Sequence, residues 1–177
     1  MNGAEPSGTT APIIVTAQLG AADQRWADAL RSAHYPPERN HLRAHLTLFR
    51  HLPPSLAVDL DAQLAALARE ARPCAIVTGP FSQGDGVAIA VRSDELLSMR
   101  EDLAMRFERY LTPQDRAVPR LHITVQNKVT PAIARATLER LRGEVRLRAI
   151  EIAALACWHY RGGPWSPIRR YPFRGGA

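Results

Sequence analysis

One short pattern occurs twice in this chain, as His45-Leu46-Thr47-Leu48 and as His122-Ile123-Thr124-Val125. Each copy lies in an apolar run that is typical of a buried β-strand. Successive side chains of a strand point to opposite faces, so the His and Thr share one face while the aliphatic residues enter a core. The repeat therefore predicts two strands that each present an imidazole and a hydroxyl on one face.

The same alternation extends the polar face beyond each motif. It adds Arg43 and Phe49 to the first strand, and Arg120 and Gln126 to the second. A core gives no packing reason for Arg, His and Thr to stand in a row, whereas a phosphate group can bind all three side chains. We therefore expect a phosphate site with an imidazole on either side. For the two arginines, a solvated strand face is the alternative.

Turn and helix signals place these strands in a repeated order of elements. We expect helices at 22–32, 55–70, 94–111 and 131–143, with Gly143 closing the last one. We expect strands at 12–19, 42–49, 74–81, 87–92, 120–129, 150–160 and 168–173. Each half then contains a helix, a motif strand, a second helix and a β-hairpin. This order predicts an α+β fold built from a duplicated unit whose copies face one another.

Composition limits the class of protein. The chain has 177 residues, of which 46% are hydrophobic, which suits one domain with a substantial core. Its formal net charge of +6 comes almost entirely from arginine, because Lys128 is the only lysine. Arginine matches phosphate geometry well, so the charge favours an anionic partner. A generally Arg-rich composition would give the same excess without a functional reason.

The first residues and the cysteines of the chain indicate its cellular location. Residues 1–11 are polar and are expected to form a flexible leader before a single domain at 12–177. No apolar run is long enough to cross a membrane, and no signal peptide is expected. Cys74 and Cys157 lack the spacing of a metal knuckle or a disulfide framework. Both are expected to be reduced core residues of a cytoplasmic protein.

Histidines near the first motif raise a metal site as an alternative. His34, His41 and His51 surround His45 in the sequence. The four-residue spacing of His41 and His45 gives ligand geometry on a helix, but here it falls on a loop and a strand. No Cys or HExxH pattern accompanies it, so we expect neither a metal nor a cofactor.

With these motifs the chain resembles the two-histidine phosphoesterase superfamily, which includes bacterial 2′-5′ RNA ligase-like proteins and RNA 2′,3′-cyclic phosphodiesterases. That family carries two copies of His-x-Thr/Ser-hydrophobic about eighty residues apart. Here the spacing from His45 to His122 is 77 residues. The segments AHLTLFRHLPP, YLTPQDR, HITVQNKV and YRGGPW support the resemblance.

The resemblance implies a two-lobed, pseudo-twofold α+β fold in which two antiparallel sheets wall a central cleft and the helices lie outside. It implies that His45 and His122 are catalytic and that Thr47 and Thr124 bind phosphate. It also suggests His45 as the proton donor and His122 as the acceptor, although nothing in the sequence breaks the symmetry between them. The implied substrate is an RNA end or a small cyclic nucleotide, and we expect a monomer.

Aromatic and polar residues near the motifs are candidates for contacts with a base or with the cleft rim. They are Phe49, Gln126, Tyr160 and Trp165. Packing in the core or at the rim is the alternative for each aromatic side chain. His159, which neighbours this group, is interpreted as structural.

Three functions fit these residues. The first is a metal-independent cyclic phosphodiesterase, in which one imidazole removes a proton from water and the other protonates the departing ribose oxygen. The second is a non-catalytic nucleotide-binding domain with the same cleft. The third is a basic RNA-binding module whose histidines only contact phosphate. The presence of both histidines and both threonines favours the enzyme.

Overall fold

The computed structural model describes residues 11–70 and 72–174, so residues 1–10 of the expected leader lie outside the described residues. The strands are β1 (Ile13–Leu19), β2 (Leu46–Leu52), β3 (Cys74–Gln83), β4 (Gly86–Arg92), β5 (His122–Gln126), β6 (Arg148–His159) and β7 (Ser166–Pro172). The helices are α1 (Ala21–His34), α2 (Ala57–Leu67), α3 (Asp94–Arg106), α4 (Pro113–Arg116) and α5 (Pro131–Glu144). The α+β prediction is confirmed.

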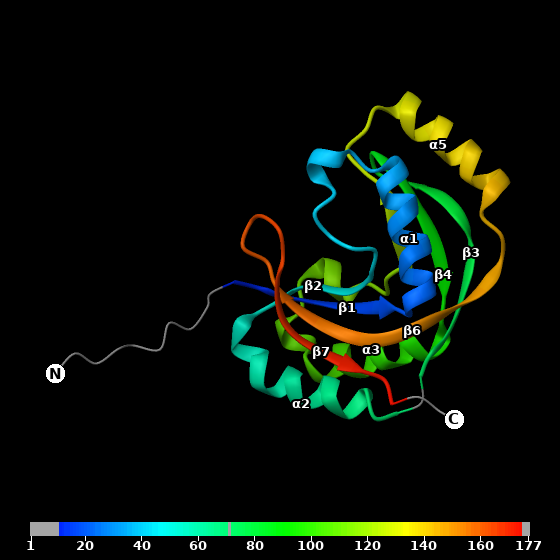
Figure 1. Ribbon diagram of the computed structural model, residues 1–177. Coiled ribbons are helices and arrows are strands. Elements are labelled where there is room, and N and C mark those ends of the chain that lie inside the picture. The colour runs from blue at the N-terminus through cyan, green and yellow to red at the C-terminus, as the bar shows by residue number, and fades with distance from the viewer. Residues whose placement is uncertain (1–10, 71, 175–177) are drawn as a thin grey trace.

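All seven strands form one antiparallel sheet in the order β1-β2-β5-β4-β3-β6-β7 (Figure 1). The long strand β6 joins the two halves of this sheet. Its first residues, Arg148–Glu151, pair with β3, whereas Ile152–His159 pair with β1. On the other side, β2 and β5 meet at a single pair, Leu46↔Ile123. The two expected sheets are therefore continuous, because β6 is long enough to serve both and the motif strands pair directly.

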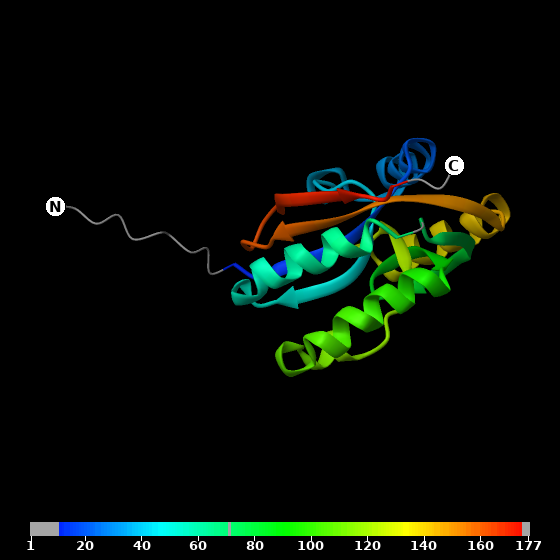
Figure 2. The same ribbon diagram turned by 90° about the horizontal axis from the view of Figure 1, so that it is seen from below.

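The core lies between this sheet and the helices. Helix α1 packs against β5 and β1, α5 against β3 and β4, and α3 against β3. Figure 2 shows α2 and α3 on one side of the strands, away from α1. The motif residues Leu46 and Ile123 are fully buried, as the alternation predicts. Burial of these aliphatic side chains fixes which face of each motif strand remains available to polar residues.

Some expected boundaries differ from the observed ones. Residues 42–45 are not part of a strand, since β2 begins only at Leu46. Strand β5 ends at Gln126, and Lys128 then adopts a φ of 60°, which no regular strand contains. Gly143 does not close the last helix, because α5 continues to Glu144.

The two cysteines have different surroundings. Cys157 is buried in β6, as expected, and burial raises the pKa of its thiol to about 12. Cys74 is exposed at the first residue of β3, so its predicted place in the core is wrong. Among the described residues, no helix is long and apolar enough to span a membrane.

Candidate active site

A cavity of about 400 Å³ contains the polar side chains of both motifs, His45, Thr47, His122 and Thr124. The pairing of the motif strands brings them together. Because Leu46 pairs with Ile123 in antiparallel register, each motif histidine lies across from the threonine of the other strand. The remaining lining residues are Arg31, Tyr35, Leu42, Arg50, Gln83, Gly84, Asn127 and Trp165.

The same local hydrogen bond holds both imidazoles. His45 Nδ1 lies 2.7 Å from the backbone oxygen of Arg43, and His122 Nδ1 lies 2.6 Å from that of Arg120. A carbonyl oxygen can only accept, so Nδ1 carries the proton in both rings and donates it. The other nitrogen, Nε2, is then an acceptor when the ring is neutral and a donor when it is charged.

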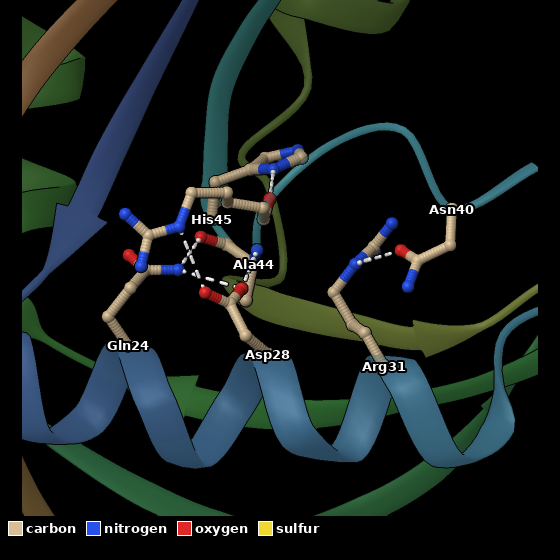
Figure 3. A network of polar contacts seen from close by, with 7 residues as sticks. Gln24, Asp28, Arg31, Asn40, Ala44 and His45 are labelled. Carbon is tan, nitrogen blue, oxygen red and sulfur yellow. Dashed lines mark hydrogen bonds and ion pairs between the residues drawn. The ribbon is translucent and has the colours of Figure 1, made fainter. Parts of the chain in front are cut away.

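Polar side chains of α1 hold the backbone that leads into the first histidine (Figure 3). Gln24 Nε2 donates to Ala44 O at 2.8 Å, and Asp28 Oδ1 accepts from Ala44 N at 2.7 Å. Asp28 Oδ2 also accepts from Arg43 Nε at 3.0 Å. These contacts satisfy the backbone of Ala44 although it lies outside any strand. They fix the chain one residue before His45.

Two guanidinium groups that the motif did not predict also line the cavity. Arg31 of α1 is buried and donates to the backbone oxygen of Thr124 at 2.7 Å and to Asn40 Oδ1 at 3.1 Å. Arg50 follows the first motif in β2. Neither Asp nor Glu is among the described residues that line this cavity. The cavity is therefore suited to an anion.

Burial lowers the pKa of both motif histidines. For His45, desolvation outweighs the hydrogen bond to the Arg43 backbone and lowers the pKa to about 4, with further repulsion from Arg31. The pKa of His122 is also lowered, first by burial and then by the nearby Arg50. Both imidazoles are therefore mostly neutral at pH 7 when no anion is bound.

These lowered pKa values predict how stability changes with pH. A histidine whose pKa is lower in the folded than in the unfolded chain binds protons more readily when unfolded, so the free energy of unfolding falls as the pH falls. For His45 this loss should run from about pH 6.5 down to about pH 4. In urea unfolding at several pH values, His45→Gln should lose less stability on acidification than the wild type. Equal slopes in His45→Gln and in the wild type would contradict this account.

An irregularity in the strand pairing follows each motif. Thr47 pairs with Thr16, but the next pair along β1 is Val15↔Phe49, so β2 contains one additional residue. On β5, Thr124 pairs with Ala88 and Gln126 with the adjacent Val87, which again leaves one additional residue. Such bulges reverse the alternation of side chains beyond them.

The predicted contacts of Phe49 and Gln126 with a ligand are therefore wrong. Phe49 is fully buried in the core, where the guanidinium carbon of Arg100 lies 4.7 Å from its ring centre. Gln126 is buried and donates to Thr137 Oγ1 of α5 at 2.8 Å. Both bulges turn these side chains away from the cavity. The same reversal places the side chains of the next residues, Arg50 and Asn127, at the cavity. Each of them lies five positions after its motif histidine.

The two predicted arginines lie outside the main cavity. The Arg43 side chain is 74% exposed and forms an ion pair with Asp28, so its predicted contact with phosphate is wrong. The Arg120 guanidinium lies 3.6 Å from the ring centre of Phe81 and lines a second, adjoining cavity. Both arginines precede the first residue of their strands, so the alternation of side chains does not apply to them.

Of the aromatic candidates, Trp165 lines the cavity and Tyr160 does not. Trp165 lines the cavity, with its ring centre 4.8 Å from that of His45. Trp158 lies 6.3 Å from Trp165 and donates its Nε1–H to Thr16 Oγ1 at 2.9 Å. Tyr160 is 44% exposed just after the end of β6 and does not line the cavity, so its predicted contact is wrong.

The histidines considered as metal ligands do not form a cluster. His41 lines a separate small cavity beside Arg43, and His51 is exposed. Among the described residues, no group of three or more His, Cys, Asp or Glu side chains could hold a metal ion.

Gln83, at the end of β3, is a site residue that sequence analysis missed. Its Nε2 lies 2.6 Å from His122 Nε2, and its Oε1 accepts from Thr124 Oγ1 at 3.5 Å. An amide N–H donated to Nε2 favours the neutral imidazole. Trp165 thus faces one histidine and Gln83 the other, which gives the two imidazoles different neighbours.

We expect Gln83→Glu to raise the pKa of His122 by about 1 to 3 pH units, because a carboxylate at this distance favours the imidazolium. NMR titration of the histidine ring protons measures this change directly. Gln83→Leu, which adds no charge, should not raise it. An unchanged His122 titration in Gln83→Glu would show that the two side chains are not in contact.

Comparison with known proteins gives the family. A sequence model described as the 2′-5′ RNA ligase superfamily matches residues 20–164. No curated protein matches the chain significantly. The chain is similar in fold to TT0787 of Thermus thermophilus, with a TM-score of 0.60 and 16% identity over 94% of this chain and 100% of that one.

Two structures of E. coli LigT are also similar. The complex with NADP+ has a TM-score of 0.56 and 17% identity over 92% of this chain and 98% of that one. The complex with 3′-AMP has a TM-score of 0.52 and 16% identity over 93% and 99%. At such identities the likeness concerns the fold. Since the family model spans most of the sequence and both motif strands, the chain belongs to the 2′-5′ RNA ligase superfamily.

Proposed function

We propose that the protein is a metal-independent phosphodiesterase that hydrolyses 2′,3′-cyclic phosphate ends of RNA or of nucleotides. One observation carries this proposal: a single cavity contains both motif imidazoles, both motif hydroxyls and two guanidinium groups. The E. coli LigT structures with 3′-AMP and with phosphate support a nucleotide or phosphate ligand for this fold.

The proposed reaction is an in-line displacement at phosphorus. Water attacks the cyclic phosphate while the neutral Nε2 of one histidine takes a proton from it. The bond from phosphorus to one ribose oxygen breaks, and the other histidine donates its Nε2 proton to that oxygen. The threonine hydroxyls and the guanidinium groups stabilise charge on the non-bridging oxygens. Following the family resemblance, we assign proton donation to His45 and proton acceptance to His122.

The reaction needs one charged imidazole, whereas burial lowers the pKa of both. The substrate can supply the missing stabilisation, because the negative phosphate lies between the rings and favours the imidazolium. Substrate binding should therefore be accompanied by uptake of a proton near neutral pH.

The direct test is hydrolysis of 2′,3′-cyclic AMP in the presence of EDTA. We expect turnover to a phosphomonoester at an undiminished rate. Activity that disappears with EDTA and returns with a divalent metal would contradict the metal-independent mechanism.

A non-catalytic nucleotide-binding domain is the second candidate. The observation that favours it is the burial of both imidazoles, which lowers their pKa values and disfavours the charged form that a proton donor needs. Calorimetric binding of 3′-AMP without turnover of any 2′,3′-cyclic nucleotide would select this candidate.

The motif threonines give a further prediction. Thr47→Val and Thr124→Val should each weaken transition-state binding by about 1–3 kcal/mol, because each removes a hydroxyl from the cavity and keeps the shape of the side chain. The melting temperature should hardly change. Measurement of kcat/KM and thermal unfolding on the same samples tests both parts.

A matched control is Thr137→Val. The Thr137 hydroxyl accepts from buried Gln126 and lies outside the cavity. This variant should lose stability and keep kcat/KM. Unchanged kinetics in both motif variants would remove the hydroxyls from the mechanism.

A further inference from the structure

A second cavity of about 220 Å³ adjoins the first. The two cavities share four lining residues, Thr47, Arg50, Gln83 and His122. A phosphate held by these side chains therefore has a cavity on each side. The substrate could extend from the reacting phosphate in two directions.

The second cavity offers a flat surface of the kind that a nucleobase stacks on. Phe81 is partly exposed, and the guanidinium carbon of Arg120 lies 3.6 Å from its ring centre. The Phe81 ring also meets His122 edge-on, with ring centres 5.9 Å apart and planes at 88°. Val118, which is 74% exposed, lines the same cavity. Aromatic rings and stacked arginines bind bases of any sequence.

The charge in this cavity favours a phosphate as well. Arg50, Arg100 and Arg120 line it, and Asp115 is the single acidic residue among its described lining. Both carboxylate oxygens of Asp115 already accept backbone N–H groups, from Arg50 at 2.9 Å and from His51 at 2.8 Å. Arg100 is 3% exposed, and its buried Nε has no hydrogen-bond partner among the described residues. Positive charge in this cavity is therefore in excess.

We propose that the second cavity binds the nucleotide that precedes the cyclic end, so that the preferred substrate is an oligonucleotide of at least two units. This inference rests on the proposed function. The terminal nucleoside occupies the larger cavity beside Trp165. The preceding phosphodiester lies near Arg120, and the preceding base stacks against the pair that Phe81 and Arg120 form. A cyclic mononucleotide then leaves the second cavity empty.

The test compares three substrates: adenosine 2′,3′-cyclic phosphate, the same nucleotide with a 5′-phosphate, and ApA ending in a 2′,3′-cyclic phosphate. In the wild type we expect kcat/KM to rise along this series, by about 10- to 100-fold in total. Arg120→Ala should remove most of the gain from the 5′-phosphate. Phe81→Leu, which keeps an apolar side chain and removes the ring, should remove most of the gain from the second nucleoside.

Ratios between substrates separate this role from effects on the reacting groups. Arg120→Ala keeps the backbone oxygen that His122 uses, and any disturbance of His122 acts on all three substrates alike. The matched control is Arg109→Ala, which removes another arginine stacked on an aromatic ring, that of Tyr110, outside both cavities. It should keep the wild-type ratios.

Three outcomes would overturn the inference, in two different ways. Equal kcat/KM for the three substrates in the wild type, or wild-type ratios in both variants, would reject the second cavity as a subsite and leave the proposed function standing. A wild type that hydrolyses none of the three substrates would reject the proposed function together with the inference.

Discussion

His45→Ala and His122→Ala should each lower kcat/KM for 2′,3′-cyclic nucleotides by about 10²- to 10⁴-fold. Each substitution removes one of the two groups that move a proton in the proposed reaction. Because the two imidazoles act as a unit, the double variant should lose little more activity than either single one. Steady-state hydrolysis at several pH values measures this effect. In the wild type we expect a bell-shaped dependence of kcat/KM on pH.

His51→Ala is the appropriate control for these variants. His51 also follows the first motif, but its side chain is exposed and does not line either cavity. It should retain wild-type activity. Full activity in either motif variant, or a wild-type rate that keeps rising with pH, would exclude acid–base catalysis by the pair.

Asp115→Ala should lower the free energy of unfolding by about 3–5 kcal/mol. Asp115 is 3% exposed, and its carboxylate accepts the backbone N–H groups of Arg50 and His51. The substitution leaves these two donors without their partner and removes the negative charge that most favours the charged form of buried Arg100. Chemical denaturation monitored by tryptophan fluorescence gives the value. Since Arg50 lines the cavity, kcat/KM should also fall.

Asp59→Ala provides the comparison. Asp59 forms an ion pair with Arg106 through two hydrogen bonds, at 2.9 and 3.2 Å, but both side chains are about half exposed. Solvent screens such a pair, so the free energy of unfolding should remain close to that of the wild type. Similar losses of unfolding free energy in both variants would mean that the contribution of Asp115 to stability does not depend on its burial.

The sequence predicted the centre of the site because the motif is a local pattern. Alternation along a strand places a histidine and a threonine on one face, and it needs no knowledge of the rest of the chain. The buried Leu46 and Ile123 confirm this alternation in both strands. That the two strands pair with each other depends on tertiary structure, which the pattern could not show.

Strict alternation of side chains gave wrong predictions where a β-bulge interrupts the strand. The bulge after each motif turned Phe49 and Gln126 into the interior and brought Arg50 and Asn127 to the cavity. A bulge inserts one residue without a clear signal in a single sequence. That both motifs carry it at the equivalent place is itself consistent with the predicted duplication.

Residues contributed by other elements were missed for a different reason. Arg31 reaches the cavity from α1 and Gln83 from the end of β3, far from either motif in the sequence. Arg31 carried a weak signal, because an arginine on a face of α1 that also holds Ala27 is unusual unless it has buried partners. Gln83 lies in a Gly- and Asp-rich turn region and carried none.

The pairing of β1 with β6 also determines when the site can form. Ile13 pairs with His159, so two segments 146 residues apart in the sequence lie side by side. Contacts between such distant residues close a very long loop, and proteins rich in them fold slowly. A nascent chain that has left the ribosome only as far as α5 already carries both motifs. It still lacks β6, the strand that joins the two halves of the sheet. We expect the phosphate cavity to assemble late in the folding of this domain, only after β6 has been synthesised.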